Sequence, residues 1–141
     1  MANRVVLDAG PLVSLVDRRD QFHVWALAQT KKLASSVHLV TCEAVLAEAF
    51  HLVRHVPGGA AAVLSFLEEE VIQLDFDVRD SLAPIAALMR RYADVPMSLA
   101  DACLVVLSEG NPDAPVFTLD SHFRIYRRHG RQTIPLIFPG K

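Results

Sequence analysis

Short apolar runs that alternate with longer stretches of helical periodicity constrain the fold of this chain more than any other feature. The runs are rich in β-branched residues and cover residues 4–8, 37–40, 71–74, 116–119 and 133–137. The expected helices cover residues 11–16, 21–33, 42–55, 79–92 and 98–108, with one more ending near residue 70, and Thr41 is the expected N-cap of the third. Strands that alternate with helices form βαβ units around a parallel sheet. We therefore expect an α/β fold, a three-layer α/β/α sandwich with a central parallel sheet of four to five strands.

The composition indicates one well-packed domain over residues 1–141. Hydrophobic residues make up 52% of the chain and charged residues 21%, which excludes a disordered protein. No apolar run approaches the ~20 residues of a membrane-spanning helix, and Asp8 comes too early for a signal peptide. We therefore expect no membrane association and a cytoplasmic location, with Cys42 and Cys103 as buried, reduced thiols.

Two acidic residues are predicted at the carboxyl edge of the sheet, where ligands collect in parallel sheets. Asp8 ends the first expected strand and Asp120 follows the fourth. A turn or a helix cap is the alternative role for either residue. Thr118 lies two residues before Asp120, so both side chains point the same way along a strand. Its hydroxyl is expected to hold a metal-bound water or to orient a carboxylate, unless it is a plain strand residue.

Glu48 lies on an apolar face of a predicted helix. It shares this face with Val45 and Leu52, and apolar residues nearly surround the helix, so we expect the helix to be substantially buried. A buried carboxylate needs a partner. Either a base, Arg54 or His51, or a metal ion is therefore expected beside Glu48.

Asp101 has two compatible predicted roles. With Ser98 it resembles a capping box, and with Leu104 it shares a face that packs against other residues. Two further acids are expected to be mainly structural. Glu43 complements the dipole of its helix and is a candidate outer residue of the site, whereas Asp94 is a cap, turn or outer acidic residue.

These carboxylates predict a magnesium or manganese site if they meet in one pocket. At an effective dielectric constant of about 20, each pair about 4 Å apart repels by about 4 kcal/mol, and a divalent cation removes this repulsion. Oxygen ligands alone favour Mg²⁺ or Mn²⁺ over zinc. His51 and His55 are one helical turn apart but have no second ligand pair for zinc. The candidate metal ligands are Asp8, Glu48, Asp101 and Asp120.

Four segments, in this order and at these separations, resemble the motifs of the PIN-domain family. They are VLDAGPL (6–12), TCEAVLAEA (41–49), DVPMSLADA (94–102) and FTLDSHF (117–123). The resemblance covers nearly the whole chain and implies an endoribonuclease that depends on Mg²⁺ or Mn²⁺. It also implies that the four candidate ligands are catalytic, with Thr118 preceding the last of them. In this mechanism the ions activate a water and stabilise charge on the phosphate.

Many small bacterial members of that family are VapC-like toxins of toxin–antitoxin pairs. The resemblance therefore implies a toxin with a cognate antitoxin, which we expect to bind near the acidic pocket. The predicted helix over residues 21–33 carries Phe22, Trp25, Leu27 and Leu33. This apolar surface exceeds what a small domain needs, so we also expect a homodimer.

Basic residues are concentrated after Asp120, although the net charge of −2 argues against a general nucleic-acid binder. That segment has no acidic residue and carries Arg124, Arg127, Arg128, Arg131 and Lys141. If residues 121–129 form a helix, the first three arginines share one face, which we expect to bind RNA phosphates. Tyr126 is expected in the core. The alternative is a solvated helix face, with RNA entering from another side, past Arg90 and Arg91.

Three other functions compete with a nuclease. A phosphorylated receiver domain needs a lysine near its last strand, but the lysines here are Lys31, Lys32 and the terminal Lys141. A phosphatase with an aspartate nucleophile needs a second aspartate two residues later, where Gly10 stands. A non-catalytic RNA- or protein-binding PIN-like module stays open, and metal-dependent cleavage would discriminate it from a nuclease.

Overall fold

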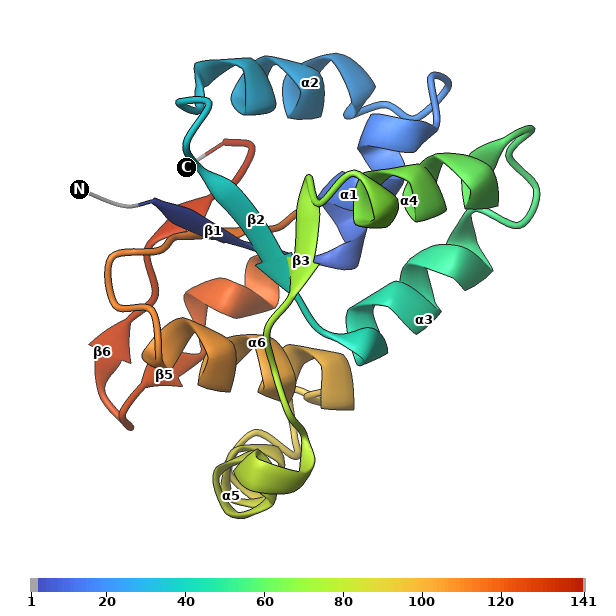
Figure 1. Cartoon of the computed structure of the whole chain (residues 1–141). Coiled ribbons are helices and arrows are strands. Elements are labelled where there is room, and N and C mark those ends of the chain that lie inside the picture. Colours follow the sequence, from blue (N-terminus) through green and yellow to red (C-terminus); the bar gives the residue numbers. More distant parts are fainter. Residues whose placement is uncertain (1–2, 141) are drawn as a thin grey trace.

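The computed structural model describes residues 3–140 and contains a five-stranded parallel sheet (Figure 1). Its strands are β1 (Arg4–Leu7), β2 (His38–Thr41), β3 (Ile72–Leu74), β4 (Val116–Phe117) and β7 (Leu136–Ile137). The strand order is β3-β2-β1-β4-β7, and every neighbouring pair is parallel. The predicted α/β class and parallel sheet are therefore confirmed.

The central strand, β1, explains why the apolar runs of the sequence are continuous. It pairs with β2 on one side and β4 on the other, so Val6 lies between Val40 and Val116. Val5, Val6 and Leu7 are all buried, because both faces of the strand are covered. A strand covered on both faces has no solvent side for polar residues, which is why the run does not alternate.

Helices cover both faces of the sheet (Figure 1). They are α1 (Ala9–Val16), α2 (His23–Lys32), α3 (Glu43–Leu52), α4 (Gly59–Glu68), α5 (Leu82–Arg91) and α6 (Leu99–Glu109). The first, second and fourth lie on one side and the last two on the other, while α3 contacts α1, α4 and α6. This arrangement fits the predicted three-layer sandwich. No helix within residues 3–140 combines the length and apolar character needed to cross a membrane.

Two expected elements begin differently in the structure. Thr41 is the last residue of β2 rather than a helix cap, and its Oγ1 donates to the Leu7 carbonyl oxygen at 2.7 Å. Cys42 is the N-cap of α3, and it is buried and free, as is Cys103. The helix predicted from residue 79 starts as a 3₁₀ helix, η1 (Arg79–Ser81), before α5.

The predicted helix over residues 121–129 is wrong. A 3₁₀ helix, η2 (Ser121–Arg124), is followed by β5 (Arg127–Arg128), which pairs antiparallel with β6 (Gln132–Thr133). His129 and Gly130 have φ angles of 50° and 80°, which is the left-handed conformation of a tight hairpin turn. The spacing of the arginines imitates a helical face, but Gly130 ends the segment in a hairpin.

Arg128 attaches this hairpin to the body of the protein. Only 2% of its surface is exposed, and its guanidinium donates to Ser108 Oγ at 3.1 Å. It also donates to the carbonyl oxygens of Pro112 and Ala114, each at 2.7 Å. Burial lowers the pKa of Arg128, and these acceptors offset the loss of hydration. The expected role of Arg128 in binding RNA phosphates is therefore wrong, because its hydrogen-bonding groups are directed inwards.

Replacing Arg128 should destabilise the protein far more than replacing its exposed neighbour Arg131. Arg128→Ala removes the partner of two carbonyl groups and leaves a cavity, so we expect a loss of about 3 kcal/mol in the free energy of unfolding. Urea denaturation followed by circular dichroism measures this difference. Equal stability of Arg128→Ala and Arg131→Ala would contradict the structural role.

Candidate active site

A cavity of about 760 Å³ lies at the carboxyl edge of the sheet, and all four predicted metal ligands line it. Asp8 follows β1, and Asp120 lies just beyond β4. Glu48 comes from α3, and Asp101 from the first turn of α6. Four segments that are distant in the sequence thus bring their carboxylates to one place. Glu43 and Asp94 are exposed and do not line this cavity.

Asp8 is the most deeply buried of these carboxylates, with 7% of its surface exposed. It is the N-cap of α1, where its Oδ1 accepts a hydrogen bond from Ala9 N at 2.8 Å. The predicted cap role is therefore confirmed, and the same side chain lines the cavity. Burial raises the pKa of Asp8 to about 6 from its usual 3.8, hydrogen bonds oppose this shift, and the charges of Asp101 and Glu48 add to it.

Thr118 connects two of the acidic positions. Its buried Oγ1 donates to Asp8 Oδ2 at 2.7 Å and accepts from Asp120 N at 2.9 Å. The hydroxyl therefore orients the Asp8 carboxylate and fixes the backbone on which Asp120 is carried. This contact matches the predicted carboxylate-orienting role and excludes a plain strand residue.

Asp101 is held from both sides. Ser98 Oγ accepts a hydrogen bond from the backbone N of Asp101 at 3.0 Å, as the capping pattern predicts. Tyr126 is fully buried, and its hydroxyl donates to Asp101 Oδ2 at 2.7 Å. Burial and this carboxylate raise the pKa of Tyr126, so the phenol stays a donor. Sequence reasoning placed Tyr126 in the core but missed this contact, although a buried tyrosine hydroxyl usually requires a partner.

Glu48 differs from its prediction in burial. It is exposed on α3, and Leu52 on the same face has 46% of its surface exposed, so the helix is covered on one side only. The expected basic partner is absent among residues 3–140, and Arg54 Nη1 instead donates to the His51 carbonyl at 2.6 Å. Partial burial, followed by the charges of Asp101 and Asp120, raises the pKa of Glu48.

Asp120 combines a turn with the site. Its Oδ1 accepts from His122 N at 2.9 Å, which is the predicted Asx-type cap. The Nδ1 atom of His122 lies 3.3 Å from the same oxygen. His122 also lines the cavity, which sequence reasoning did not predict.

The donor set suits a hard divalent cation. Over residues 3–140, no lysine or arginine forms an ion pair with any of the four carboxylates. Carboxylate oxygens without a neutralising base are the ligands that Mg²⁺ and Mn²⁺ prefer. In the same described part of the chain, no three acidic, histidine or cysteine side chains stand close enough together to hold one ion. Binding would therefore require the carboxylates to rotate towards a common point.

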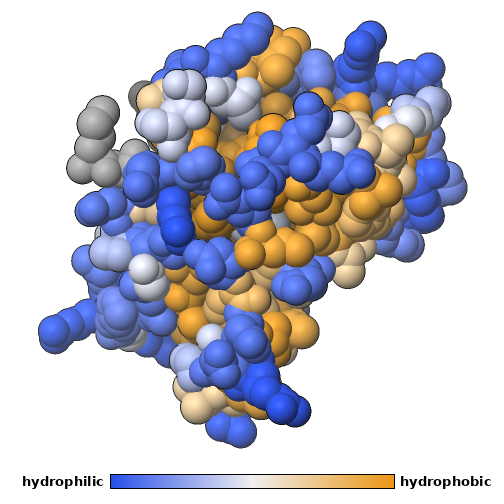
Figure 2. Space-filling view, in the orientation of Figure 1, coloured by the Kyte–Doolittle hydropathy of each residue, from blue (hydrophilic) through white to orange (hydrophobic). Residues whose placement is uncertain are grey.

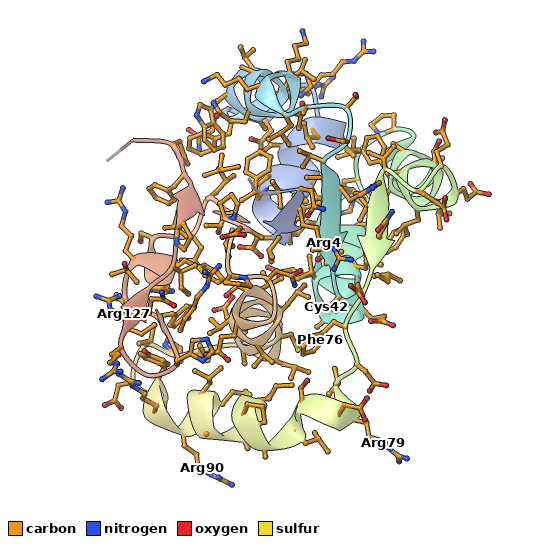
Figure 3. All side chains as sticks on the ribbon, turned by 60° about the vertical axis from the view of Figure 1, so that its left-hand side comes forward. Arg4, Cys42, Phe76, Arg79, Arg90 and Arg127 are labelled. Carbon is orange, nitrogen blue, oxygen red and sulfur yellow. The ribbon has the colours of Figure 1, made fainter. Side chains whose placement is uncertain are left out.

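The predicted phosphate-binding face does not form. Arg127 Nη1 donates to the carbonyl oxygens of residues 124, 125 and 126, and Figure 3 shows Arg127 at the hairpin. The guanidinium of Arg124 lies 4.4 Å from the ring centroid of Phe138. Arg131 is exposed, and Lys141 lies outside the described residues. Their common face depended on a helix that is absent here, so RNA contact by the exposed arginines stays a prediction.

A scan against protein-family models finds no match to this chain, and neither does a search of curated proteins.

The raised pKa of Asp8 predicts a pH dependence of stability in the metal-free protein. Because the folded pKa is above the unfolded value, the contribution of Asp8 is fully present below 3.8 and is lost as the pH rises through about 6. Relative to Asp8→Asn, the wild-type free energy of unfolding in EDTA should fall by about 3 kcal/mol between about pH 4 and about pH 7. Denaturant titrations across this range measure the difference, and a pH-independent difference would contradict it.

Proposed function

We propose that this chain is an endoribonuclease that depends on Mg²⁺ or Mn²⁺ and cleaves RNA phosphodiester bonds. One observation carries the proposal: four carboxylates from separate segments line one cavity, and no lysine or arginine of residues 3–140 pairs with them. The resemblance to the PIN-domain family supports the same activity. The proposed activity would require a metal ion because the negative charge of the carboxylates has to be neutralised before RNA, a polyanion, can approach.

Four residues of the site would bind the metal ions, and two others would orient these metal-binding residues. Asp8 and Asp101, with Glu48 and Asp120, would bind the metal, which when present supplies an activated water near neutral pH and stabilises charge on the phosphate. Thr118 orients the Asp8 carboxylate by donating a hydrogen bond to its Oδ2, and Tyr126 orients the Asp101 carboxylate in the same way. Such outer hydrogen bonds orient metal ligands, so a smaller rearrangement of the carboxylates is needed when an ion binds.

A non-catalytic PIN-like module that binds RNA or protein is the alternative. Both Asp8 and Asp101 receive a hydroxyl hydrogen bond that fixes their orientation. A module without catalysis has no need of oriented, uncompensated carboxylates, so this arrangement favours the enzyme.

A toxin role in a toxin–antitoxin pair, acting in the cytoplasm, extends the proposal and depends on the resemblance alone. The homodimer is also proposed, with a smaller apolar surface on α2 than the sequence predicts, because Trp25 packs edge-on against Phe117 with ring centroids 5.6 Å apart. Val24 is 78% exposed on α2, and a cavity of about 520 Å³ is lined by residues of α2, β2, α4 and β3. Figure 2 shows apolar residues exposed on this face of the molecule.

Cleavage of single-stranded RNA should require Mn²⁺ or Mg²⁺ and the acidic residues. Asp101→Asn should abolish it, and Tyr126→Phe should lower it by about ten- to a hundredfold because an outer hydrogen bond to a metal ligand is lost. Asp113→Asn, which changes an exposed acid outside the cavity, is the matched control. Gel analysis of end-labelled RNA measures the rates. Full activity in EDTA or in Asp101→Asn would overturn the mechanism.

Metal binding should be visible without any substrate. An ion at about a hundred times its Kd adds about 2.7 kcal/mol to the stability of the folded state, and so raises the Tm. Glu48→Gln should stabilise the metal-free protein by relieving repulsion and should reduce the response to Mn²⁺. Glu43→Gln, on the same helix but outside the cavity, should respond like wild type. Equal responses of both variants in differential scanning fluorimetry would show that Glu48 is not a ligand.

A further inference from the structure

Arg18 and Arg19 line a second cavity that adjoins the acidic one. They lie between α1 and α2, and the cavity of about 590 Å³ also includes residues from the end of α3 and the turn before α4. Leu52 lines both cavities, and 46% of its surface is exposed. The basic cavity, lined by Arg18 and Arg19, and the acidic cavity, lined by the four carboxylates, therefore share the side chain of Leu52.

The two guanidiniums of this cavity are free to bind a ligand. Within residues 3–140, neither side chain donates a hydrogen bond or joins an ion pair. The one acid in the lining is Asp17, whose Oδ1 accepts from the backbone N of Arg19 at 3.0 Å. His55 adds an imidazole to the lining. The lining thus contains two guanidinium groups and an imidazole, but one carboxylate, that of Asp17.

The C-terminal arginines contrast with this pair. Arg124 covers the Phe138 ring, Arg127 bonds to three backbone carbonyls, and Arg128 is buried against Ser108. Arg127 and Arg128 therefore donate hydrogen bonds within the protein, and the guanidinium of Arg124 is occupied by an aromatic ring. Among the residues that line either of the two cavities, the arginines are Arg18 and Arg19, which lie on the side of Leu52.

The chemistry of the pair of cavities fits a single-stranded polynucleotide. Guanidinium groups bind phosphate oxygens strongly and with defined geometry. Leu52, Val56 and Pro57 give the lining an apolar part that a nucleobase can contact. Positive charge here also offsets the repulsion between phosphates and the acidic cavity.

We infer that single-stranded RNA passes over Leu52 and that Arg18 and Arg19 bind phosphates on that side of the cleaved bond. The position relative to the cleaved bond rests on the proposed nuclease function, but RNA binding in this cavity does not require cleavage. Sequence reasoning overlooked these arginines because they stand in a short loop beside Asp17 and Asp20, where the local charge is balanced.

RNA binding in EDTA tests the inference separately from catalysis. The probe is a fluorescein-labelled single-stranded oligoribonucleotide of mixed sequence, followed by fluorescence anisotropy over a range of salt concentrations. The double variant Arg18→Ala, Arg19→Ala should raise the Kd at low salt on the order of tenfold. It should also reduce the salt slope by about 1.4, since each lost single-strand contact removes about 0.7.

A matched control removes the same charge elsewhere. Lys31→Ala with Lys32→Ala changes two adjacent exposed cations of α2 that line neither cavity, and it should leave the Kd and the slope close to wild type. Arg18→Lys with Arg19→Lys keeps the charge and should retain most of the slope. Thermal melts confirm that each variant is folded.

The results separate the two hypotheses. An unchanged Kd and slope in the arginine double variant, an equal loss in the lysine control, or no RNA binding by wild type would overturn the inference. Arginine-dependent RNA binding by a wild-type protein that cleaves nothing in Mn²⁺ would support the basic cavity and overturn the proposed nuclease.

Discussion

The parallel pairing of β1 with both β2 and β4 determines where the functional groups of this protein lie. Asp8 N donates to the Phe117 carbonyl at 3.0 Å, so the end of β1 is fixed against the end of β4. That register places Thr118 next to Asp8, and their hydrogen bond follows directly from it. The pairing of these strands therefore positions Asp8 and Thr118 without any contribution from the helices that carry Glu48 and Asp101.

The helices then add carboxylates at the same edge, and their burial decides the electrostatics. Asp8 loses most of its hydration, whereas Glu48 on the outer face of α3 retains much of its own. Burial is the main cause of the raised pKa values of Asp8 and Glu48, and repulsion from the neighbouring carboxylates adds to both shifts. We propose that a bound cation relieves this repulsion, since no lysine or arginine of residues 3–140 forms an ion pair with these carboxylates.

Much of the fold could be predicted from the sequence, and so could the four acidic residues that line the cavity, because both follow from local patterns. Continuous apolar runs reveal strands covered on both faces, and the carboxyl-edge rule then selects Asp8 and Asp120. The segment after Asp120 could not be predicted from spacing, because the burial of Arg128 depends on carbonyl groups of Pro112 and Ala114 that only tertiary structure brings near. The exposure of Glu48 was missed for the same reason, since a largely apolar helix need not be covered on every side.

The contact between Tyr126 and Asp101 makes the site sensitive to the anchoring of the hairpin. Tyr126 immediately precedes β5, and Arg128, two residues later, secures that strand to α6. If the protein cleaves RNA as proposed, replacing each basic residue in turn with alanine would therefore identify Arg128 as essential for cleavage, although its guanidinium faces the interior. Such a loss would come from a displaced phenol and a loosened carboxylate, so hits from this scan identify substrate contacts only after the fold of each variant has been checked.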